Sequence, residues 1–268
     1  MVETPELLQS LLKFSEYATT FTSVNLDLCK EPTIYPTTLL PLLNFIEEKK
    51  KVIKCTHAKS SIVEEVMTKL QREEKVELSN ENCYAIKLKP NKEPTAVNTL
   101  YKLRNNQSEC GGENTFKLLI GELVDNIYEH SKFTNALIMG QKYQEREFIE
   151  LTFFDNGITI PGTYKNQGLT FTDNEALYQA TCGLSTKGEE RGRGLRYTIG
   201  AVTQGLAGEI LIASGKAAIY KSLNILPLGS TLSFEFVKEP PFKGTLISMR
   251  IPFSTKTIDY TKLVEQSI

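Results

Sequence analysis

The stretch FIELTFFDNG occupies residues 148–157 of this 268-residue chain and predicts a buried strand that ends in a polar turn. Its first seven residues are rich in strand-forming side chains that partly alternate between apolar and polar. Asp155 stands at the predicted strand end, where its carboxylate can accept a hydrogen bond from an exocyclic amine such as that of adenine. Gly157 lets the backbone approach a flat ring closely. An ordinary Asp-Asn-Gly turn between two strands is the alternative interpretation.

A helix is predicted before this strand, over 116–131, because apolar residues recur there at spacings of three and four. Glu122 and Asn126 lie one turn apart and therefore share one face of that helix. Glu122 can orient or deprotonate a water molecule, and the Asn126 oxygen can bind a hard cation such as Mg²⁺. The alternative is an exposed polar stripe on an amphipathic helix.

A glycine-rich segment covers 183–195 and leads into a predicted helix at 196–202. Exposed N–H groups at the start of a helix form an anion site, and positive side chains strengthen it. The segment contains three such cations, Lys187, Arg191 and Arg193. It therefore predicts phosphate binding, with a flexible surface loop as the alternative.

Four elements in this order resemble the motifs of the GHKL ATPases, the family of gyrase, heat-shock chaperone, histidine kinase and MutL type. The helix that carries Glu122 and Asn126 is similar to the family's N box, and Asp155-x-Gly157 is similar to its first glycine box. The segment 242–252 resembles the closing Gly-Thr strand. The second glycine box is matched by Gly192-x-Gly194-Leu195. The resemblance covers roughly residues 98–252.

This resemblance implies an α/β sandwich with helices on one face of a mixed sheet, and with ATP bound between helices and a lid. It makes Glu122 the general base, Asn126 the Mg²⁺ ligand and Asp155 the residue that recognises adenine. Thr245 would assist Asp155. Three glycines would shape the pocket, namely Gly157, Gly192 and Gly194.

Two positions depart from the family pattern and bear on the expected catalytic rate more than on nucleotide binding. Thr159 stands where the first glycine box usually has its second glycine, and Arg196 follows Leu195 where a further glycine is usual. Around the N box the sequence looks most like the branch of anti-sigma factors and serine protein kinases. Neither histidine, His57 or His130, has the setting of a histidine kinase phosphoacceptor.

The first ninety or so residues predict strands and helices in the order β-α-β-α, which favours parallel strands covered by helices. This part weakly resembles STAS domains, the fold of anti-sigma-factor antagonists. The predicted elements are a strand at 24–28, a helix at 36–48, a strand at 52–55 and a helix at 61–71. We therefore expect a small α/β domain over 1–95, a GHKL ATP-binding domain over 96–254 and a C-terminal tail over 255–268. Residues 76–92 predict a hairpin or connector, and 231–237 a strand.

Composition narrows the class of protein. The formal net charge is −1, so the totals indicate no nucleic-acid partner. Five cysteines without a Cys-x-x-Cys pair are typical of reduced thiols. No apolar stretch approaches the roughly 18 residues that span a membrane, so we expect no membrane association and a cytoplasmic location.

Two classes of function follow. The first is a slow Mg²⁺-dependent ATPase or serine/threonine protein kinase that acts as a regulatory switch. The second is a nucleotide-gated interaction module, in which ATP or ADP selects a conformation that a partner recognises. Both imply a regulatory protein partner. A homodimer is expected from the family only, since the sequence shows no heptad-bearing helix.

Overall fold

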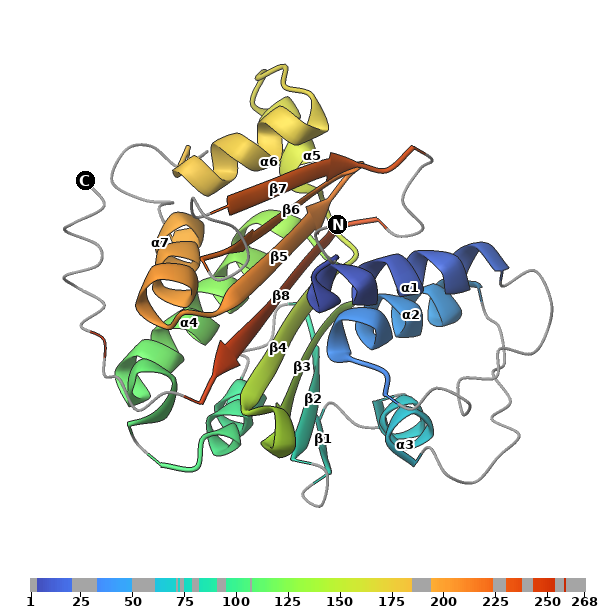
Figure 1. Cartoon of the computed structure of the whole chain (residues 1–268). Coiled ribbons are helices and arrows are strands. Elements are labelled where there is room, and N and C mark those ends of the chain that lie inside the picture. Colours follow the sequence, from blue (N-terminus) through green and yellow to red (C-terminus); the bar gives the residue numbers. More distant parts are fainter. Residues whose placement is uncertain are drawn as a thin grey trace.

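A single β-sheet forms the centre of the described protein (Figure 1). The computed structural model describes residues 4–20, 33–49, 61–70, 72, 75–78, 82–90, 95–106, 108–184, 194–223, 230–237, 243–253 and 258. Within these residues the sheet has eight strands in the order β1-β2-β3-β4-β8-β5-β6-β7. The strands are β1 (Lys75–Leu78), β2 (Cys83–Leu88), β3 (Ala136–Tyr143), β4 (Phe148–Asp155), β5 (Glu209–Ser214), β6 (Ala217–Ser222), β7 (Ser230–Glu235) and β8 (Thr245–Pro252).

Helices cover both faces of this sheet (Figure 1). One face packs against α1 (Glu6–Thr20), α2 (Pro36–Lys49) and α3 (Ser61–Leu70). The other face packs against α4 (Glu113–Asn126), α6 (Asp173–Cys182) and α7 (Gly194–Gly200), while α5 (Ile160–Asn166) precedes α6. Short helical segments connect these elements, namely η3 (Thr95–Leu103), η4 (Glu109–Gly111), η5 (Ile127–Ser131), η6 (Gln144–Arg146) and η7 (Ala201–Gly205). The predicted α/β class is confirmed.

The two faces follow from the alternation of side chains along each strand. In β4, Ile149, Leu151 and Phe153 are buried in the core that contains α4. Phe154 is buried in the other core, among the leucines of α1 and α2. Because β4 is central and buried on both sides, it lacks the strict alternation of a half-exposed strand.

Two details of the expected sheet are wrong. Every strand pairing in the described residues is antiparallel, whereas a mixed sheet was predicted. Helices cover both faces of the sheet, whereas helices on one face were predicted. The second face is covered by the N-terminal helices α1, α2 and α3, which were expected to form a domain of their own. The predicted strands at 24–28 and 52–55 lie outside the described residues.

The predicted boundary near residue 95 does not separate two cores in the described residues. The predicted hairpin is present as β1 and β2, but β2 pairs with β3 along its whole length, from Cys83↔Gln141 to Leu88↔Ala136. The side chains of α1 and α2 share one core with β3, β5 and β8. The N-terminal helices therefore form the third layer of the same folded unit. The tail predicted over 255–268 lies outside the described residues except for Ile258.

A buried ion pair fastens this third layer to the sheet. Arg250 of β8 donates from Nε to Glu150 Oε2 of β4 at 2.8 Å, and Glu150 is completely buried. The other carboxylate oxygen of Glu150 accepts from the Thr37 backbone N–H at 3.0 Å and from its hydroxyl at 2.8 Å, at the start of α2. Arg250 also bonds Glu6 of α1 at 2.7 Å. Helices α1 and α2 are thus both bonded to the β4–β8 strand pair, which lies far from them in the sequence.

We predict that Arg250→Leu lowers the free energy of unfolding by about 3–5 kcal/mol, because it leaves the Glu150 carboxylate buried without its counter-ion. Urea unfolding monitored by circular dichroism measures the change. Lys102→Ala is the control, because Lys102 pairs with Glu77 at the surface and should contribute little. Equal losses in the two variants would contradict the role given to the buried pair.

Candidate functional site

The helix predicted over 116–131 is present as α4, which continues into the π-helical turn η5. Its inner face is buried through Phe116, Leu119, Ile120 and Leu123. Asn126, at the end of α4, and His130 of η5 are half-buried at the same end of the helix. The turn stops at Lys132, which has a left-handed φ of 48°. This end of the helix therefore carries the polar side chains that face the site.

Asp155 is the last residue of β4 and is 4% exposed. Its Oδ1 atom accepts a hydrogen bond from the Gly157 backbone N–H at 2.9 Å. Burial raises the pKa of the Asp155 carboxyl to about 7, although the Gly157 N–H and the Ser131 hydroxyl oppose that rise. Burial of a carboxyl group at a strand end disfavours its charged form, and such a group is a candidate for a binding role.

The backbone of Gly157 passes so close to Ser131, at the end of η5, that only glycine fits at this position. A Cβ atom at this position would lie 2.0 Å from the Ser131 carbonyl oxygen. That carbonyl accepts a hydrogen bond from the Ile158 N–H at 2.5 Å. The predicted first glycine box is thus locked onto the end of the predicted N-box helix.

Thr245 lies directly opposite Asp155 in the β4–β8 pairing. On its other side it pairs with Ser214 of β5, whose hydroxyl lies 2.9 Å from the Thr245 hydroxyl. The Ser214 hydroxyl also accepts from the Ile160 N–H at 2.9 Å, at the start of α5. Three neighbouring strands therefore present a carboxyl and two hydroxyl groups at one end of the sheet.

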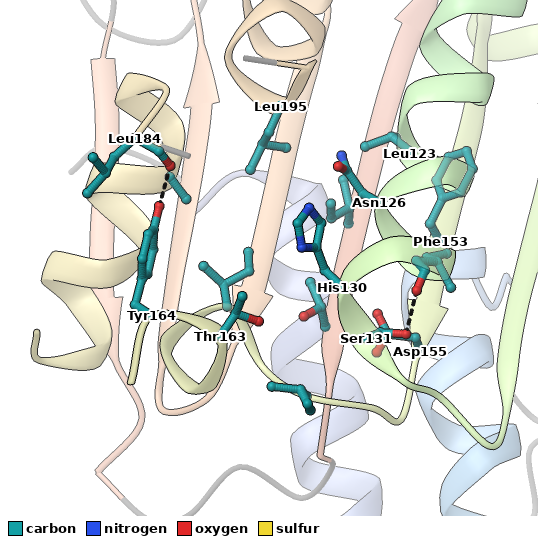
Figure 2. A pocket seen from close by; sticks show the side chains of 16 residues that line it. Leu123, Asn126, His130, Ser131, Phe153, Asp155, Thr163, Tyr164, Leu184 and Leu195 are labelled. Carbon is teal, nitrogen blue, oxygen red and sulfur yellow. Dashed lines mark hydrogen bonds between the residues drawn. The ribbon is translucent and has the colours of Figure 1, made fainter. Parts of the chain in front are cut away.

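A cavity of about 120 Å³ opens between this sheet end and the helices around it (Figure 2). Figure 2 shows Asn126, His130 and Asp155 on one side and Thr163, Tyr164 and Leu184 on the other, with Leu195 above them. The rest of the lining is mostly apolar, which suits a flat ring. It consists of Leu123, Ile127, Ser131, Phe153, Ile158, Ile160, Ala180, Thr245 and Ile247.

Glu122 contacts the start of α7. A Cβ atom on Gly194 would lie 2.0 Å from Glu122 Oε2, so the glycine permits the close approach of the carboxylate. In the described structure Glu122 is absent from the residues that line the cavity. The structure thus brings two of the predicted site residues, Glu122 and Gly194, into contact. It places Glu122 beside the cavity wall.

The two departures from the family pattern have local structural roles. Thr159, at a usual glycine position, caps α5, because its hydroxyl oxygen accepts from the Gly162 N–H at 3.0 Å. Arg196 lies along Gly183, where an added Cβ atom would be 3.0 Å from the arginine Cδ. Thr159 thus stabilises the start of α5, and the Arg196 side chain lies close to Gly183, the residue that ends α6.

Of the site residues predicted from sequence, the structure brings together Asn126, Asp155, Leu195 and Thr245 around the cavity. Gly157 lies against the lining residue Ser131, and Glu122 lies against Gly194. Lys187, Arg191, Gly192 and Arg193 lie outside the described residues. Sequence reasoning missed Ser131, Ser214 and Tyr164. The four-residue spacing that links Glu122 and Asn126 leads on to His130, whereas Ser131 lies at the cavity through the π-helical turn η5. Ser214 joins the site only through the strand register.

One polar side chain that lines the cavity, the Asn126 carboxamide, is of a type that can ligate Mg²⁺. Among the described residues, no group of three or more His, Cys, Asp or Glu side chains could hold a metal ion. Mg²⁺ usually takes one or two protein oxygens and completes its shell with phosphates and water. The Asn126 carboxamide, at the cavity wall, would be such a ligand.

A scan against models of known protein families finds no match to this chain, and a search of curated proteins finds no relative. The resemblance to the GHKL family therefore rests on the sequence motifs alone. None of the helices in the described part of the chain has both the length and the apolar character needed to cross a lipid bilayer.

We predict that Gly157→Ala strongly destabilises the protein, because backbone atoms of Ser131 occupy the space that the new methyl group needs. Thermal unfolding measures the effect. Gly121→Ala in α4 is the matched control, because nothing lies within 4 Å of its added Cβ atom. That control should be neutral or more stable by up to about 1 kcal/mol. A normal melting temperature for Gly157→Ala would contradict the close approach of Gly157 to Ser131.

We predict that Asp155 makes the stability of the protein depend on pH between about 4 and 7. In this window the folded state keeps the proton on Asp155 while the unfolded state loses it, so the free energy of unfolding falls as the pH rises. Each pKa unit between the two states corresponds to about 1.4 kcal/mol. Asp155→Asn should therefore be more stable than the wild type at pH 8 and close to it at pH 4. Parallel unfolding curves at both pH values would contradict this prediction.

Proposed function

We propose that this chain binds ATP with Mg²⁺ in the cavity between α4, β4 and β8, and that it is a slow ATPase or serine/threonine protein kinase. The observation that carries the proposal is the buried Asp155 carboxyl, held at the cavity wall next to Thr245 and across from apolar side chains. Such a wall complements a flat heterocycle with one exocyclic amine. The motif resemblance to the GHKL ATPases supports the same ligand.

In this proposal Asp155 accepts the hydrogen bond of the adenine amine, assisted by Thr245, and Asn126 ligates the Mg²⁺ that accompanies the phosphates. The triphosphate extends toward Gly194 and Leu195 at the start of α7. The sequence segment before them contributes Gly192 to the proposed second glycine box and Lys187, Arg191 and Arg193 as charges for the phosphates. Glu122 takes the proton of the attacking hydroxyl. The γ-phosphoryl group passes to that oxygen, and ADP leaves.

A second candidate function is a nucleotide-gated interaction module without significant catalysis. It is favoured by the position of the Glu122 carboxylate, which lies against Gly194 beside the cavity wall. Because the carboxylate packs against Gly194, there is no room between the two for a phosphate or a nucleophile unless one of them moves. ATP or ADP would then select a conformation of the segments around α7 that a partner recognises.

We further propose a regulatory protein partner and a cytoplasmic location. The three cysteines of the described residues, Cys83, Cys110 and Cys182, carry free thiols, which fits a reducing compartment. A homodimer stays a proposal taken from the family alone.

Calorimetric titration with ATP and Mg²⁺ tests the nucleotide site. At pH 8, above the pKa of Asp155, we predict saturable binding by the wild type and binding about 10–100 times weaker for Asp155→Asn. The Gly157 N–H would hold the asparagine oxygen, so the side-chain NH₂ would meet the adenine amine as a second donor. The variant should fold, since asparagine has the shape of aspartate. A folded Asp155→Asn protein that binds ATP as tightly as the wild type would overturn the assignment of this residue.

Phosphate release over hours, with and without candidate protein acceptors, separates the two candidate functions. We predict that Glu122→Ala binds ATP nearly normally and loses about 100-fold or more in turnover, because it lacks the general base. Asp125→Ala is the matched control, since Asp125 is the exposed neighbour on the same helix. Unchanged turnover in Glu122→Ala would remove Glu122 from the chemistry. Binding with no turnover by the wild type would select the interaction module.

A further inference from the structure

The N-terminal helix layer contacts the strand end that carries Asp155 through two asparagines. Asn156 follows Asp155, and Asn135 precedes the strand residue Ala136, which pairs with Asp155. The Asn156 N–H donates to the Asn135 carbonyl at 3.0 Å. In return, the Asn156 side-chain oxygen accepts from the backbone N–H groups of Asn135 at 2.8 Å and Thr134 at 3.0 Å. These bonds tie the residue after Asp155 to the loop before β3.

Helix α2 holds the same loop from the other side of the sheet. Asn135 Nδ2 donates to Asn44 Oδ1 at 2.9 Å and to Glu47 Oε2 at 3.1 Å. Asn44 is completely buried and Asn135 is 7% exposed, so the bond between these two asparagines is shielded from water. Glu47 also bonds Lys87 of β2 at 2.9 Å. The end of α2 is thus fixed both to the loop and to the sheet.

The Asn44–Asn135 contact is a costly way to stabilise a core. Asn44 Nδ2 and Asn135 Oδ1 are both buried without a hydrogen-bond partner among the described atoms. An apolar pair of similar size would avoid these unsatisfied groups. We infer that the contact serves to position the loop more than to stabilise the core. It fixes the Asn135 backbone N–H and carbonyl groups, which bond Asn156.

This geometry bears on Asp155 because residues 155–157 are anchored at both ends. Ile158 is bonded to the end of η5 through Ser131, and Asn156 is bonded to the loop that α2 holds. The Asp155 carboxylate itself is aimed by the Gly157 N–H, which lies between the two anchors. A group that recognises one amine must be held to within about 0.5 Å. Release of the α2 anchor would let the carboxylate drift.

We propose that Asn44 and Asn135 are positioning residues for Asp155, so that the N-terminal helix layer sets the preference of the site for adenine over a purine without the 6-amino group. The proposal rests on the proposed function, because it concerns how the same cavity distinguishes purines. It adds a contribution from a part of the chain that lies outside the motif-bearing region, roughly 98–252.

The test compares the affinities of the full chain for ATP and ITP, which differ at the purine 6-position. We expect the wild type to prefer ATP. Asn135→Ala and Asn44→Ala should lower the ATP-to-ITP affinity ratio by about three- to tenfold, the equivalent of one hydrogen bond. Glu47→Ala, at the exposed end of α2, removes the second acceptor of Asn135 together with the surface ion pair to Lys87, and it keeps the bond between the two asparagines. It is the variant to use if the others do not fold, and it should lower the ratio less.

Thr38→Val is the matched control. It removes a buried hydrogen bond between α1 and α2, from the Thr38 hydroxyl to the Ser10 carbonyl at 2.7 Å, without touching the Asn135 loop. It should lower stability and leave the ATP-to-ITP ratio unchanged. If the Asn135 and Asn44 variants also leave the ratio unchanged while the wild type prefers ATP, the inference is overturned and the proposed function stands.

Amide hydrogen exchange without nucleotide gives a readout that does not depend on the proposed function. Asn44→Ala should speed exchange over residues 155–158 relative to the wild type, whereas Thr38→Val should not. If the wild type binds neither nucleotide, the proposed function fails, and the exchange data alone decide whether α2 anchors this segment. Unchanged exchange over 155–158 in Asn44→Ala would overturn the anchor itself.

Discussion

The antiparallel pairing of β4 with β8 is the constraint on which both the site and the third layer depend. In this register Asp155 faces Thr245 at one end, while Glu150 faces Arg250 five residues earlier. The two pairs point to opposite faces, the first toward the cavity and the second toward α1 and α2. A slip of one residue would exchange the faces, removing Asp155 from the cavity and burying Glu150 without its partners.

The N-terminal helices are bound to the sheet by polar contacts at two separate places. Near the middle of β4, Glu150 bonds Thr37 and Arg250 bonds Glu6. At the far end of β4, Asn135 bonds Asn44. The Asn135–Asn44 contact lies close to Asp155 and the cavity. We therefore expect a change in the packing of α2 to alter the position of Asp155. A separate N-terminal domain would not make this contact.

Local patterns predicted the parts of this protein better than their assembly. Helix α4, strand β4 and the cavity residues Asn126 and Asp155 could be predicted because periodicity and turn residues signal them within a few positions. The direction of strand pairing and the absence of a domain boundary near residue 95 could not be predicted from local patterns. Both depend on contacts between distant residues, such as Thr37 with Glu150, 113 residues apart. Glu150 and Arg250 resemble surface charges in the sequence, and only the strand register shows that each is buried against the other.

The most direct test of the nucleotide site is a crystal structure of the full chain with Mg²⁺ and a non-hydrolysable ATP analogue. The account predicts the base in the cavity, with its exocyclic amine within hydrogen-bond distance of the Asp155 carboxylate and the metal on the Asn126 oxygen. Density for the analogue elsewhere on the chain, or a base turned away from Asp155, would contradict the central claim.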